Sequence, residues 1–274
     1  MSDFEPINFT SIDDIPGINA KAMFSSELSK TEFRETGDLS PIPIGDKHKY
    51  MPWGADDQLP YDILELIERD ETLSTCQMFN AEICYGSGLL YNTVACSEKV
   101  KEEIDAFFVG NNIPASYLGV CQDFKYFAFC VNVIILNGDG SRITRLVRKE
   151  ACYCRLGVAD ANGRIDKLYY ANWRKTKPLE EQVEIIDLLD LNAPLYDLMV
   201  RMGRMTGDDG EKRMRTSTRK FAVLTKVPTP DNTYYPIPYY ASLFRGRWYN
   251  IKRLIGLAKE AKLKNSAPIK YHIE

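Results

Sequence analysis

The chain has 274 residues, 45% of them hydrophobic, and a net charge of −3 at neutral pH. This length and composition suffice for one large domain or two smaller ones. There is no run of about eighteen apolar residues and no signal-peptide pattern, and the seven cysteines are irregularly spaced, so membrane-spanning and disulfide-rich secreted proteins are not expected.

Charge is distributed unevenly along the chain. Residues 201–274 contain 16 Lys and Arg against six Asp and Glu, a net charge of +10, whereas residues 1–200 carry −13. Segregation of this size indicates that the C-terminal quarter meets a polyanion or an acidic partner. The alternative is that the acidic part of the same chain neutralises it.

Residues 1–60 are predicted to be an extended N-terminal arm. Six prolines punctuate this segment, and no helical or strand period persists in it. Such arms are either disordered or lie across a neighbouring subunit. Within it, Tyr50–Gly54 is rich in aromatic residues and is expected to dock on an apolar surface.

Residues 61–237 begin with predicted helices. Apolar residues recur every three or four positions from Tyr61 to Ile83, with a break expected near Asp70 and an end at Gly86. A short strand is predicted over residues 89–94. Two further helices are expected before residue 127.

A sheet is predicted to follow these helices. Residues 127–148 and 151–173 are each expected to form two strands around a Gly-containing turn, which is typical of β-hairpins. Residues 183–186 are predicted to be an edge strand and residues 221–224 a further strand. Helices followed by an antiparallel sheet and one long C-terminal amphipathic helix indicate an α+β fold.

The long helix is predicted over residues 238–265, about 40 Å at 1.5 Å per residue. Its apolar positions lie on one face and are expected to pack against another helix or subunit: Phe244, Trp248, Ile251 and Ile255. Pro268 follows, and the final residues alternate like the start of another strand. We therefore expect residues 238–274 to be a long helix that acts as a structural post in a larger assembly, followed by the start of a further strand; the chain is either truncated after Glu274 or ends there.

Basic residues form a stripe on another face of this helix. They could contact DNA phosphates without sequence specificity, or a neighbouring subunit: Arg245, Lys252, Arg253, Lys259 and Lys262. The alternative is that they form the solvated face of an amphipathic helix. No groove-reading motif accompanies them, so base-specific recognition is not expected.

Catalytic and metal-binding signatures are not found in the sequence. There is no phosphate-binding loop, zinc-protease motif or nucleophile elbow. Cys152 and Cys154 have no second ligand pair, so core thiols are favoured over a metal site. No cofactor is expected. If the chain were nevertheless an enzyme, the starting points would be His48, Asp56 and Asp57.

The order of segments resembles the portal (connector) proteins of tailed bacteriophages. The resemblance covers about residues 50–274 and rests on WGADDQLPYDILELIERDETLSTC, ICYGSG, the hairpin region 123–173 and the closing segment that begins YPIPYYASLFRGRWYN. In that family a helical and β wing precedes a stem helix. Residues 61–237 would be the wing and residues 238–274 the first stem helix and the start of the clip.

The resemblance implies a structural, non-catalytic subunit of a homo-oligomeric ring, usually of twelve, at the capsid vertex. Double-stranded DNA would pass through the ring, and terminase, capsid and head–tail adaptor proteins would bind it. The protein would be found in the virion after assembly in the host cytoplasm, with no membrane. The alternatives are an intracellular nucleic-acid-associated enzyme with an unrecognised site, and an interaction module whose helix is a binding arm.

Overall fold

The computed structural model describes residues 40–54, 56–92, 94–174, 177–205, 218–230, 234–245 and 248–265. The chain divides into two compact units. The larger is Glu35–Tyr239. The smaller combines Met1–Arg34 with Tyr240–Glu274.

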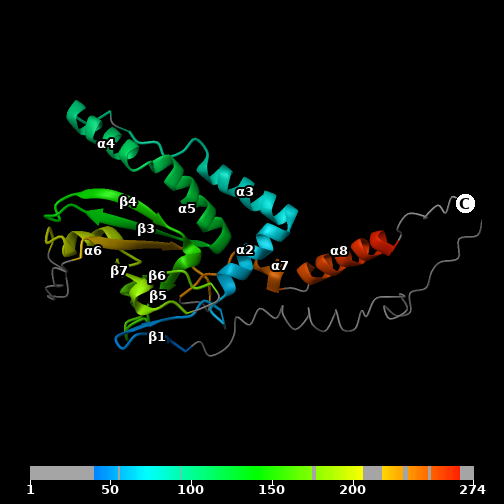
Figure 1. The fold of residues 1–274 in the computed structure, drawn as a ribbon. Helices are drawn as coiled ribbons and strands as arrows, with labels where there is room; N and C mark the ends of the chain where they lie inside the picture. Colours follow the sequence, from blue (N-terminus) through cyan, green and yellow to red (C-terminus); the bar gives the residue numbers. More distant parts are fainter. Residues whose placement is uncertain are drawn as a thin grey trace, which may run out of the picture. The chain divides into compact units, whose positions relative to one another are not determined.

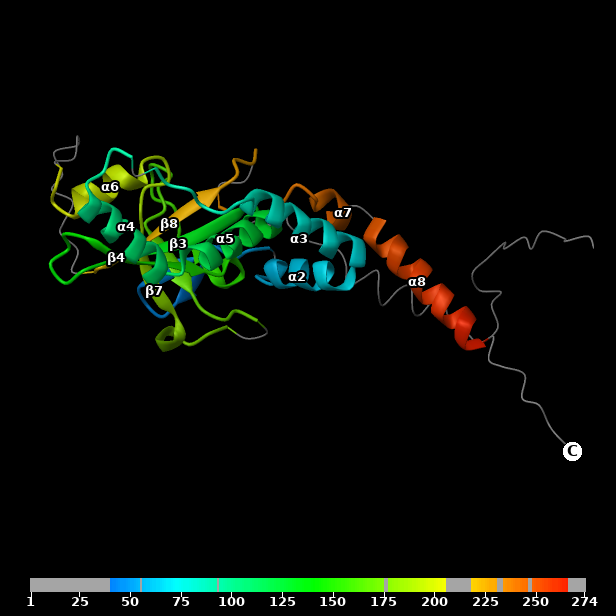
Figure 2. The same cartoon turned by 90° about the horizontal axis from the view of Figure 1, so that it is seen from above.

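Helices precede the main sheet of the larger unit (Figure 1). They are α2 (Leu59–Arg69), α3 (Glu71–Tyr85), α4 (Glu98–Gly110) and α5 (Ile113–Phe127). The predicted break is present, because Asp70 ends α2 and its carboxylate accepts a hydrogen bond from the Leu73 backbone N–H at 3.1 Å, which caps α3. Helix α5 packs on strands β3 and β4, and α3 lies alongside α5 (Figure 2).

The main sheet is mixed and has the strand order β4-β3-β8-β7-β6-β5. Its strands are β3 (Phe129–Leu136), β4 (Ile143–Lys149), β5 (Cys154–Leu156), β6 (Lys167–Tyr170), β7 (Glu184–Leu188) and β8 (Lys220–Lys226). Both predicted hairpins are confirmed, since β3 pairs with β4 and β5 pairs with β6, each antiparallel.

Three details of the predicted sheet are wrong. Strand β7 runs parallel to β8, so the sheet is not purely antiparallel. The same strand lies inside the sheet between β6 and β8 instead of at its edge. The described part of the strand predicted over 89–94, residues 89–92 and 94, forms no strand. The parallel pair arises because the chain returns to the sheet through α6 (Pro194–Arg201) between these strands.

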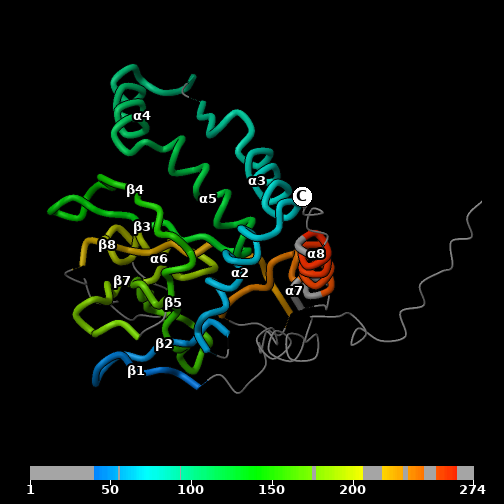
Figure 3. Tube along the Cα trace, turned by 45° about the vertical axis from the view of Figure 1, so that its right-hand side comes forward, coloured from blue at the N-terminus to red at the C-terminus, as the bar shows by residue number. Residues whose placement is uncertain are grey.

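Part of the predicted extended arm is folded. Residues 42–50 form a hairpin of β1 (Ile42–Ile44) and β2 (His48–Tyr50). This hairpin continues into the edge of the main sheet, because Tyr50 bridges Gly157 and the Met51 N–H donates to the Leu156 carbonyl at 2.9 Å. In Figure 3, β1 and β2 lie near β5. The segment therefore covers an edge that would otherwise expose unpaired backbone groups.

The core has a subsidiary cluster under α6. Buried residues from β3, β8, α6 and the segment after β7 form it: Ile134, Leu136, Leu189, Leu198 and Phe221. Arg201 at the end of α6 donates to the Leu188 carbonyl at 3.1 Å and pairs with Asp197. Helix α6 thus closes one side of the sheet with both apolar contacts and ion pairs.

The smaller unit contains a C-terminal helix, as predicted, but not as the one continuous element expected from residue 238. The described residues form α7 (Ala241–Arg245) and α8 (Trp248–Asn265), which contact each other. Residues 246 and 247 lie outside the described part of the chain, as do the final residues predicted to start a strand. The eighteen residues of α8 give a length of about 27 Å.

Candidate functional site

Arg155 on β5 is fully buried and lies at the centre of a network that fixes residues 50–57. Its Nε donates to Asp57 Oδ1 at 2.5 Å, and its Nη2 donates to the Asp57 carbonyl at 2.9 Å. Its Nη1 donates to the carbonyls of Cys152 and Cys154, each at 3.0 Å. Every guanidinium nitrogen therefore has a protein partner. We call this group of contacts the Arg155 clasp.

The Asp57 carboxylate also accepts several hydrogen bonds within the clasp. It accepts a hydrogen bond from the Trp53 backbone N–H at 2.8 Å and one from the Tyr50 hydroxyl at 3.3 Å. Burial raises the pKa of the Asp57 carboxyl, whereas the Arg155 charge and these hydrogen bonds act in the opposite direction. Asp57 has a φ of 61°, a left-handed conformation that Asp tolerates better than most residues.

Aromatic rings complete the clasp. Trp53 stacks on Tyr235 with a centroid distance of 4.8 Å and an interplanar angle of 6°. The Arg155 guanidinium lies over the rings of Trp53 and Trp173, at 5.7 and 5.4 Å from their centroids. The Tyr235 hydroxyl donates to the Met51 carbonyl at 2.7 Å and accepts from the Leu156 N–H at 2.9 Å. Because its polar groups are paired and enclosed, the clasp is suited to holding the fold together.

The starting points named for an enzymatic alternative do not converge. Asp57 is engaged with Arg155, whereas His48 Nδ1 lies 3.5 Å from the Tyr169 hydroxyl. Asp56 is exposed and accepts a hydrogen bond from the Gln58 backbone N–H at 3.1 Å. The hydrogen bonds of the described residues therefore join none of these groups into an acid–base pair.

Cys152 and Cys154 are both buried, but they do not lie on a single strand as the hairpin prediction required. Cys152 belongs to the 3₁₀ turn η2 (Ala151–Tyr153), and Cys154 begins β5. Burial raises the pKa of the Cys152 thiol to about 11 and that of Cys154 well above its usual value. Among the described residues, no group of three His, Cys, Asp or Glu side chains could hold a metal ion.

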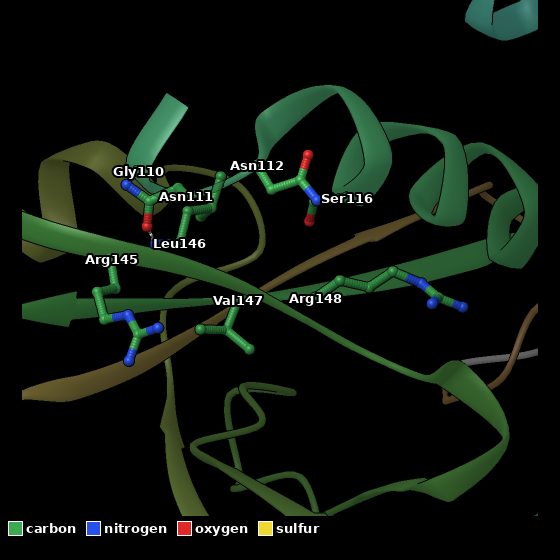
Figure 4. Close-up of a pocket in the computed structure, with 8 residues that line it drawn as sticks. All are labelled: Gly110, Asn111, Asn112, Ser116, Arg145, Leu146, Val147 and Arg148. Carbon is green, nitrogen blue, oxygen red and sulfur yellow. Dashed lines mark hydrogen bonds between the residues drawn. The ribbon is translucent and has the colours of Figure 1, made fainter. Parts of the chain in front are cut away.

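A pocket of 370 Å³ lies between the α4–α5 turn and β4 (Figure 4). Two of its polar side chains, Arg148 and Asn111, are engaged within the fold. Arg148 pairs with the buried Asp123 at 2.7 Å. Asn111 accepts from the Leu146 backbone N–H at 3.1 Å and donates to the Phe107 carbonyl at 2.8 Å. The pocket is thus mainly the seam where the α4–α5 turn covers the edge strand β4.

The residues predicted to form the basic stripe lie on α7 and α8. Lys252, Lys259 and Lys262 of α8 are exposed, and Arg253 is half-buried. Arg245 is the last residue of α7, and its side chain lies outside the described part of the structure. The structure therefore places four of the five residues on one helix, which we call the basic helix α8.

The residues predicted for helix packing are also distributed between α7 and α8. Ile251 and Ile255 lie on α8 and are 44% and 50% exposed. Phe244 is in α7 and Trp248 begins α8, but nothing is described of either side chain. Ile251 and Ile255 are thus open to a further contact, as far as the described residues show.

A second surface, on α2 and α3, was not predicted from the sequence. Helix α3 contains no Lys or Arg and exposes apolar side chains: Met78 at 51%, Phe79 at 60% and Ile83 at 60%. Exposed carboxylates of the two helices accompany them: Asp62, Glu65, Glu68, Glu71 and Glu82. We call this surface the acidic helix pair. The signal that could have found it is the absence of any cation from residues 70–85.

The charge of the acidic helix pair is only partly neutralised by the neighbouring cation. Arg69 pairs with Glu65 at 2.5 Å. Partial burial raises the pKa of Asp62 to about 6, and the negative charges of Asp56 and Glu65 add to that shift. Carboxylates placed this close together repel one another, and a cationic partner would relieve the repulsion.

The chain matches no known protein-family model and no curated protein sequence. Across the described residues, none of the helices combines the length and apolar character needed to cross a lipid bilayer.

Proposed function

We propose that this protein is a structural subunit of a tailed-bacteriophage portal ring at the capsid vertex. The ring would form the channel through which DNA is packaged and ejected, and the attachment point for terminase and head–tail adaptors. Glu35–Tyr239 would be the wing-like part, and α8 would belong to the stem. The resemblance in segment order supports this assignment, and the helix–sheet–helix order of the structure is compatible with it.

The observation that carries the proposal is the exposure of Ile251 and Ile255 on a basic helix. Two large apolar side chains one turn apart on an exposed helix face form a small continuous apolar surface, which another surface could cover. A ring supplies such a surface to every copy, because each subunit contacts the next in the same way. The Arg155 clasp is compatible with a structural role, since two buried charged groups, Asp57 and Arg155, are committed to contacts within the fold.

Particle mass tests the proposal directly. Light scattering combined with negative-stain imaging of the product of the complete reading frame should show ring-shaped particles of many copies. A monodisperse monomer at every protein and salt concentration would overturn the portal assignment. A small complex that forms only with an added partner would favour an interaction module instead.

A further inference from the structure

The outward side of α3 has the composition of a buried interface. Its inward residues Leu73, Gln77 and Ala81 are buried. Cys76, Phe79 and Ile83 are exposed and follow one another at helical spacing, so they lie on one face. A helix that buries a glutamine and exposes a phenylalanine has a second face without cover inside the described part of the chain.

Acidic side chains border this face of α3. Glu71 and Glu82 are both exposed and eleven residues apart, which is close to three full turns, so they point to nearly the same side. Met78 lies between them on that side. The strip is therefore apolar with negative borders and contains no positive charge.

Helix α8 has the complementary arrangement. Ile251 and Ile255 are about half exposed and lie one turn apart. Lys259 and Lys262 are exposed in the following turns, and the helix contains five Lys and Arg against one Glu. At about 22 Å and 27 Å, α3 and α8 are also similar in length.

We propose that the basic helix α8 of one copy docks on the outward face of α3 of a second copy. This inference rests on the proposed ring and names the surface that receives α8. Ile251 and Ile255 pack against Phe79 and Ile83, and lysines lie beside the acidic borders. Since each copy carries one α8 and one α3, the contact is head-to-tail, and repeating it closes a ring.

Charge and apolar exposure together favour the α3 face of a second copy over DNA as the binding partner of α8. Phosphates would satisfy the lysines, but they would leave Ile251 and Ile255 in water. The α3 face offers an apolar surface for the isoleucines and carboxylates for the lysines at once. Charge complementarity of this kind also fixes which surfaces pair.

Two charge-reversal variants test the contact. The first carries Glu71→Lys and Glu82→Lys on α3, and the second carries Lys259→Glu and Lys262→Glu on α8. Each variant alone places like charges across the interface and should raise the dissociation constant about 30-fold or more. In an equimolar mixture, the unchanged α8 of the first variant meets the unchanged α3 of the second. The two reversed surfaces also attract each other, so association should return.

A matched control reverses two exposed carboxylates elsewhere, Glu102→Lys on α4 and Glu181→Lys on η3 (Glu180–Gln182). It changes the net charge as much as the α3 variant does, and it should assemble like the natural chain. Sedimentation velocity measures association, and circular dichroism confirms that all variants are folded.

Several outcomes would overturn the inference. If the natural chain forms rings and neither variant weakens them, the portal assignment stands and the α3–α8 contact is wrong. If the mixture fails to recover while one chain with all four reversals does, α8 docks within its own chain. If only the α8 variant has an effect, and that effect is lost binding of a 30-base-pair duplex, DNA is the occupant. A natural chain that never associates overturns both proposals.

Discussion

Asp57 and Arg155 are 98 positions apart in the sequence and form a buried ion pair with an Nε–Oδ1 distance of 2.5 Å. The pair joins the segment before α2 to β5, and thereby the helical half of the larger unit to its sheet. A buried ion pair adds modestly to net stability, but loss of one partner leaves the other charge buried in the core without compensation.

Asp57→Ala should lower the free energy of unfolding by about 3–5 kcal/mol, because Arg155 would be left as an uncompensated buried charge. Urea denaturation followed by far-ultraviolet circular dichroism measures this. Asp56→Asn is the matched control, since Asp56 is exposed and the substitution keeps the oxygen that accepts from Gln58 N–H. A stability loss below 1 kcal/mol for Asp57→Ala, on the order of a surface substitution, would contradict the role of the clasp.

Tyr235→Phe should cost about 1–3 kcal/mol, because it removes one hydroxyl that serves two buried backbone groups. Those groups are the Met51 carbonyl and the Leu156 N–H. Tyr234→Phe is the comparison: its hydroxyl accepts from the Ala159 N–H at 3.1 Å, at a half-buried position where water can substitute. Thermal unfolding of both variants should rank Tyr235→Phe as clearly less stable, and the reverse order would be inconsistent with the structure.

Elements whose signal is local were predictable from the sequence. Two apolar or β-branched-rich runs, residues 129–136 and 143–149, on either side of a Gly-containing turn specify the β3–β4 hairpin. The helix break at Asp70 follows from a short acceptor side chain that caps the next helix. The C-terminal helix was also expected, because its apolar period extends over many turns. In each case the residues that define the element are neighbours in the chain.

Features that depend on distant partners were not predictable. Nothing in residues 184–188 shows that β7 pairs in parallel with β8, since that register is set by the path through α6. Asp57 was named as a candidate catalytic residue because nothing near it in the sequence shows its ion-pair partner, Arg155. Helix α3 has apolar residues on two faces, so helical spacing alone does not reveal that Gln77 is buried and Phe79 exposed.

Lowering the pH should reduce the stability of the sheet, because it protonates the Asp187 carboxylate. Partial burial acts to raise the pKa of its carboxyl, but hydrogen bonds from Lys167 and Thr218 outweigh this, and the net pKa is below the ordinary value. A lowered pKa stabilises the fold above the unfolded-state pKa of about 4, and this stability is lost as pH falls through the folded-state value.

Asp187→Asn should therefore cost about 1.5–3 kcal/mol at pH 7, because hydrogen bonds to a charged group are replaced by neutral ones. The difference from the natural chain should shrink steadily below pH 4. Urea unfolding at pH 7, 5 and 3.5 measures this, and a difference that stays constant across the series would show that the charge of Asp187 is not what stabilises the sheet.

Ile251→Ser combined with Ile255→Ser should weaken self-association without destabilising Glu35–Tyr239. Both side chains are about half exposed in the chain, so their loss leaves little new cavity. If a second copy covers them, burial of the exposed halves is worth about 2 kcal/mol in total, or roughly a 30-fold change in the dissociation constant. Sedimentation velocity over a range of protein concentrations measures that change.

The control for this variant is Leu195→Ser on α6, where the leucine is 69% exposed on another part of the fold.

The dependence of association on salt separates the electrostatic and the apolar contributions to the α8 contact. Added NaCl screens lysine–carboxylate attraction but leaves apolar burial intact, so the serine variant should dissociate further as salt increases. Equal effects of Leu195→Ser and the α8 double variant would mean that general loss of surface hydrophobicity, and not a specific α8 contact, governs association.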